Sequence, residues 1–198
     1  MLGKGYIKKA WSIYLEDLAP FLLAGFILSI INLVTYGFLT GPFICGLMYM
    51  TLKKLRGEKI EVADGFKGFE NFGHTFLAGI VYNILVGVGF FFLIIPGLIL
   101  GAMFIYMFPF IVDKKMDFVQ AFKASKDLVK GNLLEHTLFF LVVSLIGISG
   151  FIFLIIGIFF TIPLMYIAFG VAYYYLVYPS AKEAGKQIEA PAPEAKKE

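Results

Sequence analysis

Two histidines and two nearby carboxylates are the residues of this chain whose types could bind a metal. His74 and His136 are its only histidines; Glu70 lies one helical turn before the first, and Glu135 is adjacent to the second. Imidazole and carboxylate groups are ligands of zinc. The H-E-x-x-H spacing is missing, however, and a single cysteine cannot form a cysteine-rich zinc motif. We therefore note these four residues as metal candidates and predict neither a metal nor another cofactor.

Sequence motifs of catalysis are missing as well. The chain contains no G-x-S-x-G, no Walker-type phosphate loop and no cluster of carboxylates. Cys45, the lone cysteine, lies inside an apolar stretch, where packing is its expected role. We predict that the protein is not an enzyme.

Asn32 and Asn83 are the most strongly polar residues deep within the long apolar stretches. Proteins that couple transport to protons or ions usually keep an ionisable residue at that depth, and this chain has none there. Two interpretations fit the asparagines: they line a substrate path, or they make interhelical hydrogen bonds, each worth about 0.6 kcal/mol. We expect the hydrogen bonds.

The distribution of charge predicts the elements that carry these residues. Hydrophobic residues make up 60% of the chain and charged residues 16%, against about 25% charged in soluble domains. Residues 18–52, 71–112 and 137–181 contain no Asp, Glu, Lys or Arg. A bilayer core needs about 20 helical residues per crossing, so each run predicts a helical hairpin. The predicted fold class is all-α integral membrane with six transmembrane helices, although the short run 18–52 also allows a re-entrant hairpin.

All 17 lysines and arginines lie outside these three runs. They fall within residues 1–17, 53–70 and 113–135 and in the tail from Lys182. An even number of crossings places these segments on one side, and the positive-inside rule makes that side cytoplasmic. We therefore expect a multi-pass protein of the cell (plasma) membrane with cytoplasmic N- and C-termini. The 14 acidic residues share the same segments, so no basic face predicts nucleic acid binding.

One order of features occurs three times along the chain, at residues 4–56, 60–115 and 117–180. Each copy begins with an amphipathic stretch and continues with an apolar hairpin, as internal repeats do. We predict three parallel pseudo-repeats related by an axis along the membrane normal. They would form one transmembrane domain over residues 1–180. The tail, residues 181–198, is rich in Ala, Lys, Glu and Pro, which predicts a disordered cytoplasmic segment.

The amphipathic stretches carry aromatic residues on one face and lysines largely on the other. Such helices suit the plane of the lipid headgroups, so the three stretches predict a cytoplasmic collar. Asp117 and Gln120 have the spacing of a capping box, which predicts that the third stretch begins there. The membrane-interface residues predicted on this basis are Trp11, Tyr14, Phe66, Phe69, Phe118 and Phe122.

A proline follows each membrane entry by about the length of one crossing. These prolines are Pro42, Pro96 and Pro163. A proline in the first turn of a helix loses no intrahelical hydrogen bond. We therefore expect each one to lie at the start of the returning helix of its hairpin.

Part of the second and third copies resembles a known membrane family. Ile95-Pro96-Gly97 through Pro109-Phe110 and then Asp117 to Gly131, about 37 residues, are similar to the membrane domain attached to some bacterial glycerophosphodiester phosphodiesterases and to its stand-alone, largely uncharacterised prokaryotic relatives. The pattern Ala…Ser…Leu…Gly is matched by Ala121, Ser125, Leu128 and Gly131. The resemblance implies a membrane fold. It implies no phosphodiesterase activity, because the matched residues belong to the membrane part. Residues 98–108 lack the arginine that many relatives carry before the second proline, so no role of that arginine is carried over.

Two functions from different classes are compatible with these patterns. The first is a non-enzymatic membrane scaffold that organises or senses lipid or a membrane partner through its collar. The alternative is a passive channel or transporter for a small neutral or lipid-like molecule. The expected partners are membrane lipids, together with a membrane protein or a second copy of the chain, and no nucleic acid.

Overall fold

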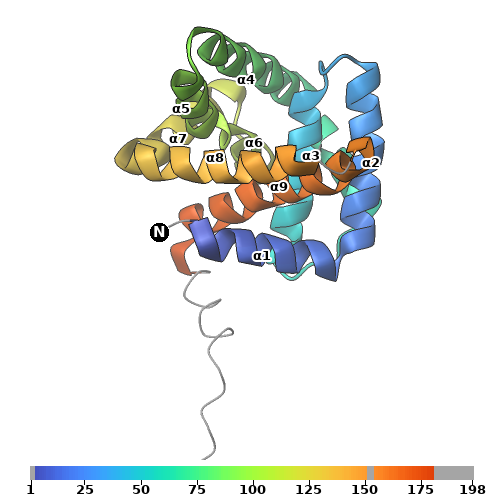
Figure 1. Cartoon of the computed structure of the whole chain (residues 1–198). Helices are drawn as coiled ribbons and strands as arrows, with labels where there is room; N and C mark the ends of the chain where they lie inside the picture. The colour runs from blue at the N-terminus through green and yellow to red at the C-terminus, as the bar shows by residue number, and fades with distance from the viewer. Residues whose placement is uncertain (1–2, 151–153, 181–198) are drawn as a thin grey trace, which may run out of the picture.

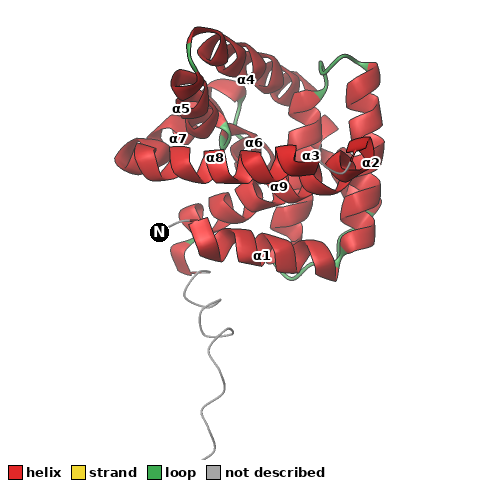
Figure 2. Ribbon diagram, viewed as in Figure 1, coloured by secondary structure: helices red, strands yellow, loops and turns green. Residues whose placement is uncertain are grey.

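The computed structural model describes residues 3–150 and 154–180, and all regular secondary structure in these ranges is helical (Figure 2). The predicted tail 181–198 lies outside the described residues. The helices are α1 (Gly3–Glu16), α2 (Leu18–Val34), α3 (Thr40–Leu55), η1 (Val62–Phe69), α4 (Phe72–Phe92), α5 (Ile94–Phe104), α6 (Met107–Lys114), α7 (Phe118–Val129), η2 (Lys130–Asn132), α8 (Leu133–Ser149) and α9 (Leu154–Val177).

Local sequence signals place several helix starts. The Asp117 carboxylate accepts from the backbone N–H of Gln120 at 2.8 Å, and the Gln120 side chain accepts from the N–H of Asp117 at 3.3 Å, so the predicted capping box is confirmed. Glu61 and Asp64 form a second one at η1. Pro42 and Pro96 lie in the first turns of α3 and α5, as predicted.

The prediction for Pro163 is wrong, because this proline lies inside α9, which already begins at Leu154. A proline inside a helix removes one backbone hydrogen bond and tends to kink the helix. Here the Pro163 ring packs closely on Gly25 of α2. The contact is so close that a Cβ atom added to Gly25 would lie only 2.5 Å from the Pro163 Cγ. Pro163 therefore marks the place where α9 meets α2 instead of the start of a helix.

Four helical stretches within the described residues are long and apolar enough to cross a membrane. They are Phe72–Phe92, Ile94–Lys114, Phe118–Ser149 and Gly157–Val177. A bent pair, Gly5–Glu16 with Leu18–Val34, also passes when taken together, with an angle of 95° between its parts. The all-α class is thus confirmed, and several long apolar helices indicate a membrane-embedded protein. Six crossings in three repeats are not shown, since α2 and α3 have 17 and 16 residues.

The core is centred on α3, whose residues are nearly all buried from Gly41 to Leu52. Neighbouring segments approach its backbone at glycines. A Cβ on Gly46 would overlap the backbone oxygen of Gly65 in η1, and one on Gly41 would overlap that of Thr75 in α4. Because no side chain separates these backbones, η1 lies directly along α3.

The helices do not form one parallel bundle. In Figure 1, α2 and α3 run as a pair along one side of the molecule, whereas α8 and α9 run across them. The helix α1 packs against α9, where the Tyr6 ring stacks on Tyr175 at 5.7 Å. Where α9 crosses α2, a cleft opens between them.

Candidate functional site

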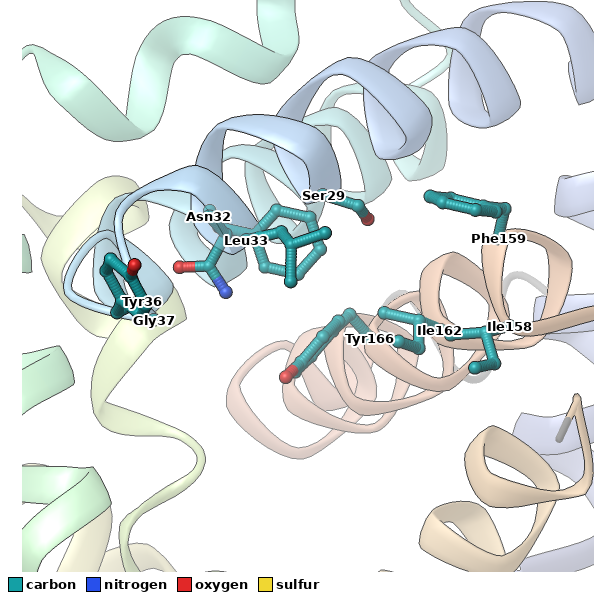
Figure 3. Close-up of a pocket in the computed structure, with 10 residues that line it drawn as sticks. Ser29, Asn32, Leu33, Tyr36, Gly37, Ile158, Phe159, Ile162 and Tyr166 are labelled. Carbon is teal, nitrogen blue, oxygen red and sulfur yellow. The ribbon is translucent and has the colours of Figure 1, made fainter. Parts of the chain in front are cut away.

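A cleft of about 550 Å³ lies between α2, the start of α3 and the first half of α9 (Figure 3). Its size is within the range of about 300–1,000 Å³ that is usual for small-molecule sites. Most of its wall is apolar, with a few polar groups among the apolar side chains. The residues that line it are Ser29, Asn32, Leu33, Tyr36, Gly37, Phe43, Ile158, Phe159, Ile162 and Tyr166.

The cleft follows from the way in which α2 and α9 cross. The two helices touch where the Pro163 ring sits against Gly25, and there the Phe26 and Phe159 rings lie 4.8 Å apart. Helices that cross steeply are in close contact only near the crossing point. Beyond it they diverge, and the Phe43 ring of α3, packed edge-on against Tyr166 at 5.5 Å, forms the inner wall of the gap.

The polar groups of the cleft have few partners. The Asn32 side-chain oxygen accepts from the Thr40 hydroxyl at 3.3 Å, whereas its NH₂ group makes no hydrogen bond to the part of the chain that the structure describes. The hydroxyls of Ser29 and Tyr166 likewise make none to the described residues. Figure 3 shows Asn32, Tyr36 and Tyr166 toward one end of the cleft and Phe159 and Ile158 toward the other.

The two asparagines predicted at depth have different surroundings. Asn32 joins the end of α2 to Thr40 at the start of α3, so its contact spans two helices. Asn83 lies exposed on α4, and its side chain makes no hydrogen bond to any described residue. Of the two, Asn32 alone belongs to the cleft.

The four metal candidates have separate partners. The Nδ1 atom of His136 is 3.4 Å from the Tyr106 hydroxyl in the interior, whereas the Nδ1 of His74 accepts from the backbone N–H of Phe118 at 3.4 Å. Glu70 is paired with Lys67 one turn earlier. Among the residues that the structure describes, no group of three or more His, Cys, Asp or Glu side chains could hold a metal ion, and this includes Glu135.

The predicted membrane-interface residues differ in exposure. Trp11 and Phe66 are exposed, at 52% and 39%, and Phe69, Phe118 and Phe122 are half-buried. Tyr14 is buried at 3%; its hydroxyl has no hydrogen-bond partner within the described chain, and burial raises its pKa to about 12. Of the six predicted membrane-interface residues, Trp11 and Phe66 therefore form the exposed aromatic surface of the collar.

A row of stacked phenylalanines continues this surface from η1 into α4. The ring centroids of Phe66 and Phe69 are 6.2 Å apart, those of Phe69 and Phe72 6.4 Å, and those of Phe72 and Phe76 5.1 Å. Phe72 is exposed like Phe66, and Lys67 and Glu70 lie beside the row. We call Phe66, Phe69, Phe72 and Phe76 the phenylalanine row.

Sequence reasoning missed a polar cluster around Asp113, whose side chain is fully buried. Arg56 at the end of α3 pairs with one carboxylate oxygen, and the hydroxyls of Tyr173 and Tyr178 donate to the other at 2.9 and 2.8 Å. Lys114 lies over the Tyr178 ring, 4.3 Å from its centroid. The only signal in the sequence is the position of Asp113, directly after the charge-free run 71–112.

Ion pairs join three of the four charged segments. Lys54 of the second pairs with Glu16 and Asp17 of the first, and the hydrogen bond to Asp17 raises the pKa of Lys54. Arg56 of the second pairs with Asp113 of the third. These contacts bring 1–17, 53–70 and 113–135 together in space.

Neither protein-family models, nor curated proteins, nor solved structures gave a match to this chain. The resemblance to the phosphodiesterase-linked membrane domain therefore stays a prediction. Two of its matched positions have a packing role: Ala121 is fully buried, and the Ser125 hydroxyl donates to the backbone oxygen of Met103 at 2.7 Å.

Proposed function

We propose that this protein is a non-enzymatic, membrane-embedded scaffold that organises or senses lipid through an aromatic surface at the cytoplasmic interface. The observation that carries the proposal is the phenylalanine row, which leaves Phe66 and Phe72 exposed next to Lys67. Aromatic rings beside lysines are the usual means by which a protein contacts the headgroup region. Trp11 on α1 gives a second contact of the same kind.

For the arrangement in the membrane, we propose that the predicted three-unit order holds with two full hairpins and one re-entrant one. The full hairpins are Phe72–Lys114 and the part of Phe118–Val177 that follows the amphipathic helix α7, and α2 with α3 enters and returns on the cytoplasmic side. Helices of 17 and 16 residues extend only about 24–26 Å, and α1 meets α2 at 95°. Four crossings keep both termini cytoplasmic, in agreement with the ion pairs between the charged segments.

Cysteine labelling tests this arrangement. An impermeant thiol reagent added outside should label Leu93→Cys, between α4 and α5, and Phe160→Cys, in the first half of α9, and neither Thr40→Cys nor Lys126→Cys. The native Cys45 is fully buried, which keeps the background low. Outside labelling of Thr40→Cys to the level of a denatured sample would restore six full crossings, and labelling of Lys126→Cys would refute the orientation.

Trp11, the only tryptophan, tests the lipid contact directly. In vesicles with anionic lipid, its fluorescence should be blue-shifted and quenched by lipids brominated at shallow acyl positions, because an interfacial ring lies about 5–10 Å into the boundary. A Phe66→Trp probe on a Trp11→Phe background should report the same depth. Tyr14→Trp on the same background is the matched control. Because Tyr14 is buried, the brominated lipids should quench this probe least.

The opposite quenching pattern would contradict the proposal. Free access of aqueous iodide to both the Trp11 and the Phe66→Trp probes, without quenching by bromine, would mean that this surface faces water. It would then serve a protein partner, and lipid sensing would lose its support.

The second candidate function, passive movement of a lipid-like molecule, is favoured by the cleft between α2 and α9. Its ten lining residues include no charged side chain, which suits a neutral molecule.

A further inference from the structure

We propose that the cleft between α2 and α9 is a binding site for a neutral, single-chain amphiphile, of the chemical class of a monoacylglycerol or a long-chain alcohol. The inference rests on the proposed membrane function, since it assumes that lipid surrounds α2 and α9. It adds a specific site to what is otherwise a surface contact.

The lack of charged residues in the cleft selects the headgroup. None of its lining residues is ionisable near neutral pH, and the runs 18–52 and 137–181, which supply all of them, contain no Asp, Glu, Lys or Arg. Phosphate and carboxylate groups are held in proteins by Arg or Lys through charge-assisted hydrogen bonds. An anionic head would enter this cleft without a counter-charge, so the site favours a neutral one.

The unpaired polar groups select a head with oxygen atoms that can accept hydrogen bonds. The Asn32 NH₂ and the Tyr166 hydroxyl lie toward the same end of the cleft (Figure 3), and neither has a hydrogen-bond partner among the described residues. Unsatisfied polar groups are costly in hydrocarbon. A glycerol ester or an alcohol offers a carbonyl or hydroxyl oxygen to the amide and a hydroxyl oxygen to the phenol.

The rest of the cleft suits an acyl chain. Ile158, Phe159 and Ile162 of α9 form an apolar wall that leads away from Asn32 and Tyr36. This separation of a polar from an apolar end is the pattern that an amphiphile requires. A single chain is favoured because the volume of about 550 Å³ is in the middle of the range for small-molecule sites.

A tryptophan reporter in the cleft tests the proposal. The full-length chain carrying Phe159→Trp and Trp11→Phe is placed in phosphatidylcholine nanodiscs and titrated with dibromostearoyl monoglyceride. Quenching should saturate at a low mole fraction of the probe. Dibromostearic acid, held ionised at alkaline pH, should require about tenfold more, because its carboxylate finds no counter-charge.

Two substitutions in the cleft should weaken binding. Asn32→Leu and Tyr166→Phe should each raise the half-saturating mole fraction of the monoglyceride about five- to tenfold, which corresponds to one hydrogen bond lost in each variant. Asn83→Leu makes the same chemical change on α4, away from the cleft, and should leave the titration unchanged. An Ile84→Trp reporter on the exposed face of α4 should show only linear, collisional quenching.

Native mass spectrometry of the unsubstituted chain gives a second measurement that needs no reporter. One retained monoglyceride per chain, lost in Tyr166→Phe, supports the site. Linear quenching of the Phe159→Trp reporter, equal to that of Ile84→Trp, with no retained monoglyceride, overturns it and leaves the bulk lipid chains as the occupant. Equal titrations for the monoglyceride and the acid overturn the selection for a neutral head. In either case the Trp11 result still decides the proposed function separately.

Discussion

Replacing Gly46 with alanine should destabilise the folded chain by about 3 kcal/mol or more, the upper part of the range for overpacking. The added Cβ would overlap the backbone oxygen of Gly65. A side chain could rotate away, but a backbone carbonyl moves only with its segment. The 3-10 helix η1 would have to leave α3, which also breaks the ion pair between Lys53 and Asp64, 2.9 Å apart. Heat unfolding followed by Trp11 fluorescence measures the loss.

Gly87→Ala is the matched control for this prediction. Gly87 is also inside a helix, but it is exposed on α4 and an added Cβ meets nothing within 4 Å. Alanine is the better helix former by about 1 kcal/mol, so the unfolding temperature should stay the same or rise. Gly68→Ala should behave like Gly46→Ala, since its Cβ would overlap the backbone oxygen of Pro42. Normal unfolding of both Gly46→Ala and Gly68→Ala would disprove the close contact of α3 with η1.

These glycines illustrate what a sequence can and cannot predict here. The helical class and the start of α7 follow from local signals, namely charge-free runs and the reciprocal contacts of Asp117 and Gln120. The role of Gly46 depends on a backbone nineteen residues away, at Gly65. Local spacing carries no information on that approach.

The cleft was beyond sequence reasoning for a similar reason. The sequence identifies Asn32 as a polar residue within a long apolar run, and Pro163 as a residue that usually marks the start of a helix. Their meaning changes because the Pro163 ring packs on Gly25, so that α9 crosses α2 there. A proline read only from its own neighbours predicts a helix start, whereas tertiary packing makes it a contact point. Asp113 was likewise taken for the edge of an apolar run, although its partners lie 57, 60 and 65 positions away.

Removing Arg56 should show how much the buried carboxylate of Asp113 depends on its counter-charge. Arg56→Met leaves Asp113, whose side chain is 0% exposed, without a cation. Breaking a buried ion pair costs about 3–5 kcal/mol. We expect about 3 kcal/mol, because the hydroxyls of Tyr173 and Tyr178 continue to donate to the carboxylate. The unfolding temperature measured as for Gly46→Ala should fall accordingly.

Adding Asp113→Asn to Arg56→Met should restore most of the lost stability. The amide is neutral, and its oxygen can still accept from one of the two tyrosines. Asp113→Asn alone should cost less than Arg56→Met, because the Arg56 side chain is 37% exposed and can turn to water. The double variant would then be more stable than Arg56→Met. This is the result expected if the loss of stability in Arg56→Met comes from a buried charge without a partner.

Lys67→Met, which breaks the exposed pair with Glu70, should change stability by less than about 1 kcal/mol. If Arg56→Met were as harmless as Lys67→Met, Asp113 would have to be hydrated, and α3, α6 and α9 would not be held together by a buried charge.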